Sequence, residues 1–242
     1  MKIIKFCPKR HHISSVSSIQ LGNLEYYRLH KKPEIKDSSE GRHLDQIEHT
    51  EPVTYSTNEI NKLNLNVKFE GPGTITVGKK IEINEIVNNV YIFCSTKIED
   101  GENPNTEMGK QFGEDYDSFY EIKDLQKFTD KISELLLQML PEAYPENGLL
   151  KIYSCHGEIQ YVGDKKTTFR NISEAILDRK NRNGLEIVFT KTKESLEYPS
   201  YNFEKNREYR FAWFIFDEKQ NPINTKHQTI LINALSLKEF TG

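Results

Sequence analysis

The sequence has few of the residues and segments that mark several protein classes. Its 242 residues include three cysteines, Cys7, Cys94 and Cys155, and no two of them form a C-x-x-C pair. A disulfide scaffold or a multi-cysteine zinc site is therefore not expected, and reduced thiols are the simplest interpretation. The first apolar run is too short for a secretory signal peptide, and no stretch approaches the roughly 20 apolar residues that cross a bilayer. We therefore expect a cytoplasmic protein that has no membrane partner.

An excess of charge is also lacking, because 33 Lys and Arg oppose 36 Asp and Glu. The formal charge of −3 argues against a general binder of nucleic acid or anionic membrane, although it allows a local basic patch. Four enzyme motifs are missing: the P-loop G-x-x-x-x-G-K-[ST], the dinucleotide-binding G-x-G-x-x-G, H-E-x-x-H and G-x-S-x-G. Their absence removes the enzyme classes that are easiest to recognise, but not enzymes in general.

Bulky core residues are plentiful, with 13 Phe, 12 Tyr and one Trp. The most apolar predicted strands are Asn88–Thr96 and Arg207–Phe216. Asp124–Leu140 has one continuous apolar stripe, which predicts a long helix that Pro141 closes. Because strands and helices do not alternate regularly, we predict an α+β fold, with one domain over residues 1–242. It should contain a twisted, mainly antiparallel sheet, one long helix and a few short helices.

The amino-terminal region is expected to be a strand, a helix and a second strand. Lys2–Phe6 predicts the first strand. Apolar residues near helical spacing predict a helix over His11–Leu21, and Gly22-Asn23 is typical of a helix end. Leu24–Leu29 is then predicted to be a strand.

Several residues near the predicted central strands could carry chemistry. Glu208 begins the most apolar strand, where a carboxylate either holds a substrate hydroxyl or forms a salt-bridged strand end. Ser95 and Thr96 end the other central strand, and their hydroxyls either orient a ligand or cap a turn. Tyr26 and Tyr27 form either a stacking surface or a half-buried strand.

Two polar segments offer further candidates. Arg10, His11 and His12 form a basic cluster, although adjacent histidines on a helix point about 100° apart and rarely share a metal ion. The loop that contains Asp37 and Glu40 is either part of a binding rim or an Asx-type turn.

Taken together, these segments resemble a large bacterial family without assigned function. The family carries an ND-x-x-E loop, a C-F-S strand and a late E-K-E-Y-R strand. The matching segments here are D-S-S-E-G, V-Y-I-F-C-S-T, F-G-E-D-Y-D-S-F-Y-E-I, G-E-I-Q-Y-V and Y-x-F-E-K-N-R-E-Y-R-F-A-W. The resemblance covers roughly Ile4 to Ile215, and it implies a place among phage-defence and toxin genes.

The same layout is similar, more distantly, to ADP-ribosyltransferases. That resemblance implies that NAD is a substrate and that Arg10 or His11 holds its pyrophosphate or ribose. It implies that Ser95 and Thr96 fix the nicotinamide half, and that Tyr26 or Tyr27 brackets the nicotinamide ring. Glu208 would bond a ribose hydroxyl and stabilise the oxocarbenium-like charge as nicotinamide leaves.

Three functional hypotheses follow. The first is an NAD-using, ADP-ribosyltransferase-like or NAD glycohydrolase-like effector of anti-phage defence or a toxin system, acting on a protein or nucleic-acid acceptor without a metal. The second is a non-catalytic module that recognises a phage-derived trigger or a nucleotide. The third is a nuclease that holds Mg²⁺ through some of Asp37, Glu40, Asp115, Asp117 and Glu208, which the charge balance supports weakly. The sequence makes no prediction of oligomeric state.

Overall fold

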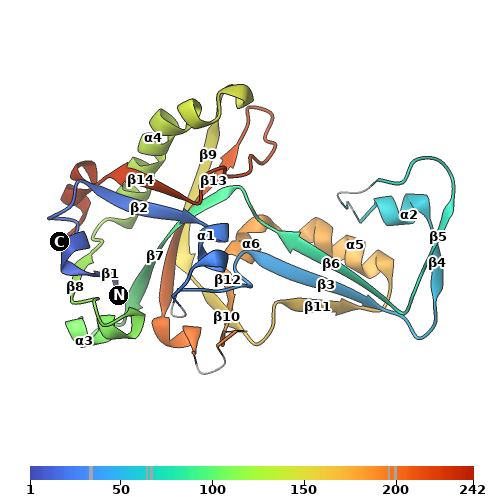
Figure 1. The fold of residues 1–242 in the computed structure, drawn as a ribbon, viewed down its shortest axis with the longest axis horizontal. Helices are drawn as coiled ribbons and strands as arrows, with labels where there is room; N and C mark the ends of the chain where they lie inside the picture. Colours follow the sequence, from blue (N-terminus) through green and yellow to red (C-terminus); the bar gives the residue numbers. More distant parts are fainter. Residues whose placement is uncertain (33–34, 64, 66–67, 196, 199–200) are drawn as a thin grey trace. The chain divides into compact units, whose positions relative to one another are not determined.

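The protein is represented by a computed structural model that describes residues 1–32, 35–63, 65, 68–195, 197–198 and 201–242 (Figure 1). Its chain contacts group into two compact units. Unit 1 contains residues 1–40, 88–163 and 191–242, and unit 2 contains residues 41–87 and 164–190. Both units are therefore assembled from segments that lie far apart in the sequence.

Unit 1 is built on a seven-stranded sheet. Its strands are β1 (Lys2–Cys7), β2 (Ser18–Asn23), β7 (Val90–Ile98), β8 (Ser118–Glu121), β9 (Lys151–Glu158), β13 (Glu208–Phe216) and β14 (Thr229–Asn233). The order is β14-β2-β7-β1-β8, and β13 joins β7 to β9. These strand pairs are antiparallel. The prediction of an α+β fold with a mainly antiparallel sheet is thus confirmed.

The two strands that the sequence predicts to be the most apolar, β7 and β13, lie at the centre of this sheet. β13 is buried along eight of its nine residues, and β7 along seven of its nine. Strands covered on both faces have nearly continuous apolar sequences, and both segments show this pattern. β7 and β13 pair in register from Glu208 opposite Thr96 to Phe214 opposite Val90.

The long helix α4 (Leu125–Ala143) packs on this sheet (Figure 1). Asp124 begins it, because its side chain accepts a hydrogen bond from the backbone N–H of Lys127 at 3.0 Å. The helix buries Phe128 among the aromatic residues of β13, which include the fully buried Trp213. The prediction that Pro141 closes the helix is wrong. Pro141 lies inside the helix, two residues before its end, where its missing N–H removes one i→i−4 hydrogen bond and only two residues of helix follow it.

The predictions for residues 11–29 are wrong. Residues 9–11 form a short 3-10 helix, η1 (Lys9–His11), and β2 follows it instead of a helix. Ile19 and Leu21 are buried two positions apart, which is strand spacing rather than helical spacing. Leu24–Leu29 is the helix α1, because the Asn23 side chain accepts from the Tyr26 N–H at 2.8 Å and so begins a helix.

Short elements complete unit 1. They are α3 (Thr106–Gly109), the 3-10 helices η2 (Lys110–Phe112), η3 (Pro145–Asn147), η4 (Phe203–Asn206) and η5 (Leu235–Phe240), and the strand β10 (Gln160–Val162). β10 pairs with β12 (Thr190–Thr192), which begins at the last residue of unit 2. Within the described part of the chain, no helix is long and apolar enough to cross a membrane.

Unit 2 has its own sheet and core. Its sheet contains β3 (Arg42–Glu48), β6 (Lys80–Ile86) and β11 (Lys166–Phe169), with β11 parallel to β3 and β6 antiparallel to it. A hairpin of β4 (Val53–Ser56) and β5 (Thr74–Val77) contacts α2 (Thr57–Asn61), while α5 (Ile172–Asn181) and α6 (Gly184–Val188) pack against β3. Ile47, Ile83 and Phe169 of the sheet share one apolar cluster with Ile172 of α5.

Candidate functional site

The sheet of unit 1 forks at the middle of β7. β1 pairs with residues 96–98 of β7, and β2 pairs with residues 91–92. β13 occupies the other edge of β7 from Val90 to Thr96. In the described part of the chain, residues 93–95 are therefore paired on one edge only, at the point where β1 and β2 diverge.

A cavity of about 750 Å³ opens at this fork within unit 1. Ligand sites are typically pockets of roughly 300–1,000 Å³, so this cavity is large enough for a nucleotide. Its lining includes every site residue that the sequence singled out for NAD: Arg10, His11, Tyr26, Tyr27, Ser95, Thr96 and Glu208. The fold thus brings together four segments that are widely separated in the sequence.

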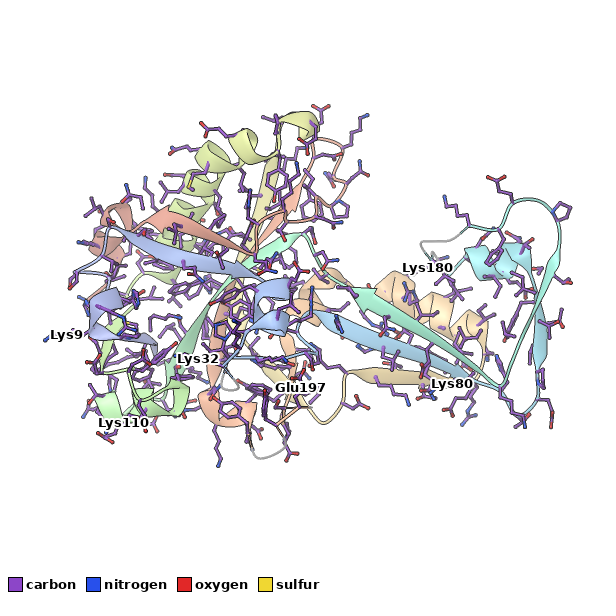
Figure 2. The ribbon with its side chains drawn as sticks, in the orientation of Figure 1. Lys9, Lys32, Lys80, Lys110, Lys180 and Glu197 are labelled. Carbon is purple, nitrogen blue, oxygen red and sulfur yellow. The ribbon has the colours of Figure 1, made fainter. Side chains whose placement is uncertain are left out.

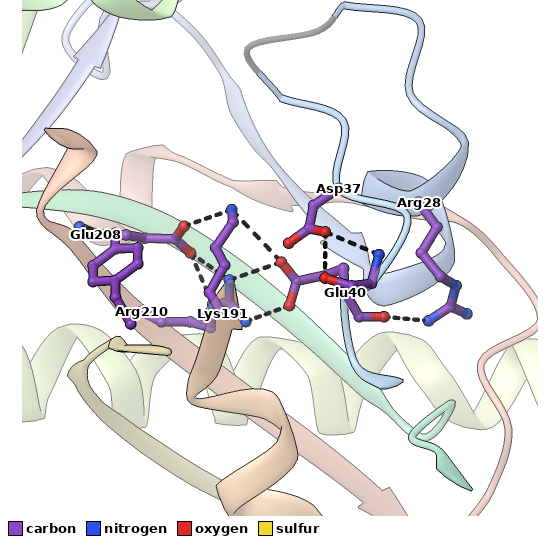
Figure 3. Close-up of polar contacts among 8 residues, drawn as sticks. Arg28, Asp37, Glu40, Lys191, Glu208 and Arg210 are labelled. Carbon is purple, nitrogen blue, oxygen red and sulfur yellow. Dashed lines mark hydrogen bonds and ion pairs between the residues drawn. The ribbon is translucent and has the colours of Figure 1, made fainter. Parts of the chain in front are cut away.

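Glu208 lies in a buried network of ion pairs (Figure 3). It is 7% exposed, and its Oε1 accepts from the Nε and a terminal nitrogen of Arg210 at 2.8 and 2.6 Å. Its Oε2 accepts from the Nζ of Lys191 at 3.1 Å. Arg210 also donates to both carboxylate oxygens of Glu40, at 2.8 and 3.1 Å. Figure 3 shows Lys191 and Arg210 lying between the carboxylates of Glu208 and Glu40.

The network holds Glu208 in its ionised form. Burial by itself would raise the pKa of this carboxyl, but the adjacent charges of Arg210 and Lys191 outweigh it and keep the pKa well below its usual range. Burial likewise opposes protonation of Lys191, yet the carboxylates of Glu208 and Glu40 keep its pKa above the ordinary value. Glu208 is therefore suited to accept hydrogen bonds and to oppose positive charge, and not to act as a general acid.

The loop that contains Asp37 and Glu40 supports this network from inside unit 1. Asp37 Oδ1 accepts from the backbone N–H of Ser39 at 2.9 Å, which is the geometry of an Asx-type turn. Asp37 and Glu40 are 2% and 1% exposed, so the loop does not present these two carboxylates as an open binding rim. Of the two interpretations of this loop, the turn is the one observed.

Arg10 and His11 lie near the cavity on η1, beyond the end of β1. Arg10 is exposed and forms an ion pair with Asp115 at 3.0 Å, and its Nε donates to His11 Nε2 at 3.3 Å. The Nζ of Lys32, which is labelled in Figure 2, lies 3.7 Å from the other oxygen of Asp115. Arg10, His11 and Lys32 all line the cavity, and Asp115 offsets part of their positive charge.

The two tyrosines lie on α1, not on a strand. Their rings meet edge to face with centroids 5.2 Å apart. A Cβ atom on Gly22 of β2 would come within 2.8 Å of ring atoms of both tyrosines, so glycine is needed for their close approach to the strand. Burial and the neighbouring Cys94 raise the pKa of Tyr27.

The residues of β7 divide between the two faces of the sheet. Thr96 is opposite Glu208 in the register, whereas Ser95 is opposite Tyr209, on the face that packs against α4. The Oγ of Ser95 is buried and has no hydrogen-bond partner among the described residues. Burial raises the pKa of the Cys94 thiol to about 12, which makes this cysteine a poor nucleophile.

Sequence reasoning missed three lysines of the cavity, which are Lys191, Lys5 and the Lys32 described above. Lys191 enters from β12, and nothing in the T-K-T segment indicated its pairing with Glu208. Lys5 lies on β1, and its Nζ donates to the carbonyl oxygen of Cys94 at 2.6 Å. Its signal was the alternation of β1, which puts a lysine on the same face as the buried residues Ile3 and Cys7.

The carboxylates named for a metal site lie in two different settings. Asp37, Glu40 and Glu208 belong to the buried region around Lys191 and Arg210, while Asp115 pairs with Arg10 and Asp117 accepts from the N–H of Lys9. Among the described residues, no group of three or more His, Cys, Asp or Glu is arranged to hold a metal ion. The nuclease hypothesis stays a hypothesis.

No family model matches this chain, and neither a curated protein nor a solved structure matches it. Any functional conclusion must therefore come from the residues and geometry of the cavity.

Proposed function

We propose that this protein binds NAD in the cavity of unit 1 and transfers or hydrolyses its ADP-ribose moiety, as an effector of bacterial anti-phage defence or of a toxin system. The observation that carries the proposal is the joint position of Arg10, Ser95 and Glu208 in the lining of one cavity. The resemblance to ADP-ribosyltransferases implies separate roles for these three residues, at the pyrophosphate, the nicotinamide half and the reacting ribose. The volume of about 750 Å³ is compatible with a dinucleotide.

The proposed reaction breaks the bond between the nicotinamide nitrogen and the C1′ carbon of the adjoining ribose. The bonding electron pair leaves with nicotinamide, and the ribose acquires positive charge. Water or an acceptor on a protein or nucleic acid then forms a bond to C1′ and releases a proton. Glu208 is held ionised, so it can accept a hydrogen bond from a ribose hydroxyl and stabilise the positive charge.

The tyrosines and the cations supply complementary contacts. Tyr26 and Tyr27 offer ring faces and edges for the nicotinamide or adenine ring. Arg10 and His11, which are exposed at the cavity, can contact phosphate oxygens, although Arg10 would then exchange its pairing with Asp115 for the ligand.

One observation favours a second candidate, a module that binds a nucleotide or a phage-derived trigger without chemistry. Glu208 is already engaged by two cations, which reduces the negative charge that it can offer to a transition state. A binding module needs no reactive carboxylate, and the same cavity would serve it.

The test is calorimetric binding of NAD and measurement of nicotinamide release by purified wild-type protein and by Glu208→Gln. We expect the variant to retain NAD binding within about tenfold and to lose nicotinamide release by about a hundredfold or more, the scale on which single electrostatic contacts act in transition states. Full release by Glu208→Gln would refute the catalytic role. Binding without release by the wild type would support the recognition module.

Glu204→Gln is a matched control. Glu204 lies four residues before Glu208, and its side chain is about half exposed in an ion pair with Lys193 at 3.3 Å. It is not part of the cavity lining. Its substitution removes the same charge by the same chemistry and should leave nicotinamide release unchanged.

A further inference from the structure

Lys5 places a cation at the fork of the sheet, where β1 and β2 part from β7. Its ammonium donates to the carbonyl oxygen of Cys94 at 2.6 Å, and so fills a position that a strand N–H takes in a continuous sheet. The same nitrogen lies 4.5 Å from the centre of the Phe93 ring. Lys5 is half-buried and lines the cavity. An ammonium group has three donors, and the Cys94 carbonyl uses one of them.

Lys5 differs from the other cations of the cavity, because no carboxylate among the described residues lies close enough to balance its charge. Lys191 and Arg210 each lie within ion-pair distance of both Glu40 and Glu208 or make direct bonds to them. Among the described residues, no carboxylate lies within ion-pair distance of Lys5. Burial lowers the pKa of Lys5, and the more distant Glu208 offsets this only in part. A partly desolvated cation that lines a cavity is stabilised when an anionic group enters.

We propose that Lys5 is the anion-binding residue of the cavity and takes a phosphate oxygen of the bound nucleotide at the fork. The neighbouring Ser95 hydroxyl, which is buried and has no partner among the described residues, can bond the same ligand. The proposal deepens the proposed function, since it rests on a nucleotide ligand. It shifts the main phosphate contact from Arg10, which is exposed and paired with Asp115, to an interior residue of β1.

The test uses inorganic pyrophosphate, which contains the proposed recognition group and lacks nicotinamide and ribose. Pyrophosphate should raise the melting temperature of the wild type in a concentration-dependent manner, because a ligand that binds only the folded state stabilises it. In Lys5→Met the affinity should fall by about tenfold or more, as expected when a charged hydrogen bond is lost. Lys2→Met is the matched control, because Lys2 is an exposed lysine of the same strand that does not line the cavity.

A second measurement does not depend on the folding of a variant. An amine-acylating reagent is applied to the wild type, and the modification of Lys5 and Lys2 is followed by peptide mass spectrometry. Pyrophosphate should slow acylation of Lys5 severalfold and leave that of Lys2 unchanged. Equal protection of both lysines, or undiminished pyrophosphate binding by Lys5→Met, would overturn the subsite.

The proposal and the NAD chemistry can fail separately. Loss of pyrophosphate binding in Lys5→Met, without nicotinamide release by the wild type, would support the phosphate subsite and contradict the transferase hypothesis. Nicotinamide release by the wild type, with pyrophosphate binding unaffected in Lys5→Met, would do the reverse. ADP-ribose in place of pyrophosphate should bind more tightly if the subsite belongs to a nucleotide site, and its tighter binding should also depend on Lys5.

Discussion

The substitution Glu208→Gln should destabilise unit 1 as well as remove the proposed chemistry. Glu208 is 7% exposed and accepts three charged hydrogen bonds from Arg210 and Lys191. Removing one partner of a buried ion pair costs about 3–5 kcal/mol. Glutamine keeps the volume and one acceptor oxygen, and Glu40 still balances Arg210. We therefore expect the lower end of this range, about 3 kcal/mol.

The assay is unfolding in urea followed by the fluorescence of Trp213. It is the one tryptophan of the chain, and it lies fully buried in the core of unit 1, so its signal reports that unit. Glu40→Gln should cost about as much, because Glu40 is 1% exposed and bidentate to Arg210. Glu204→Gln should cost about 0–1 kcal/mol, as is usual for exposed pairs. If Glu208→Gln lowers the free energy of unfolding by less than about 1 kcal/mol, the buried network is refuted, because breaking a buried ion pair costs about 3–5 kcal/mol.

Three further predictions concern single positions. The pKa of Glu208 in the folded state lies below its unfolded value of about 4.3, so the stability that Glu208 contributes is present above that pH and is lost as the pH falls further. In Glu208→Gln the free energy of unfolding, followed by the fluorescence of Trp213, should therefore depend less on pH in this range. Arg207 has a left-handed backbone with φ 45° and ψ 48°, so Arg207→Gly should be about 1 kcal/mol more stable than Arg207→Ala in urea, and equal stabilities would contradict this strain. Gly22→Ala should displace the two tyrosine rings of α1 and weaken NAD binding in calorimetry, whereas Gly78→Ala, with nothing within 4 Å of its Cβ, should not.

The parts of the fold that could be predicted from the sequence are those with long local signals. The strands β7 and β13 are nine residues long and mostly apolar, and the apolar stripe of α4 extends over several turns. The order of β2 and α1 was reversed because Asn23 is compatible both with the end of a helix and with the start of one. Only its bond to the Tyr26 N–H decides between them. The sequence did not indicate the division into two units either, because the D-S-S-E-G segment at the first passage between them is typical of an ordinary turn and the other passages have no low-complexity linker.

In the site, too, contacts within one strand could be predicted from the sequence, whereas contacts between residues far apart in the chain could not. Alternation along β13 puts Arg210 on the face of Glu208, so that pairing could have been anticipated from the strand alone. The partners Lys191 and Glu40 could not, because Lys191 is 17 positions from Glu208 and Glu40 is 170 positions from Arg210. The residues that the sequence singled out therefore lie in the cavity lining, whatever element carries them. The charges that set the protonation of Glu208 depend on tertiary contacts.

The buried cations also limit which roles Glu208 can have. A carboxylate that Arg210 and Lys191 keep ionised cannot donate a proton at neutral pH, so a mechanism that needs a general acid at this position is incompatible with the geometry. Acceptance of a ribose hydroxyl and stabilisation of a cationic ribose are compatible, because both use the ionised form. Lys191 and Arg210 each pair with both Glu208 and Glu40, so the two carboxylates and the two cations offset one another's charge. Nicotinamide release that is present in the wild type and lost in Glu208→Gln would therefore distinguish a transferase from a nucleotide-binding module, which needs no reactive carboxylate.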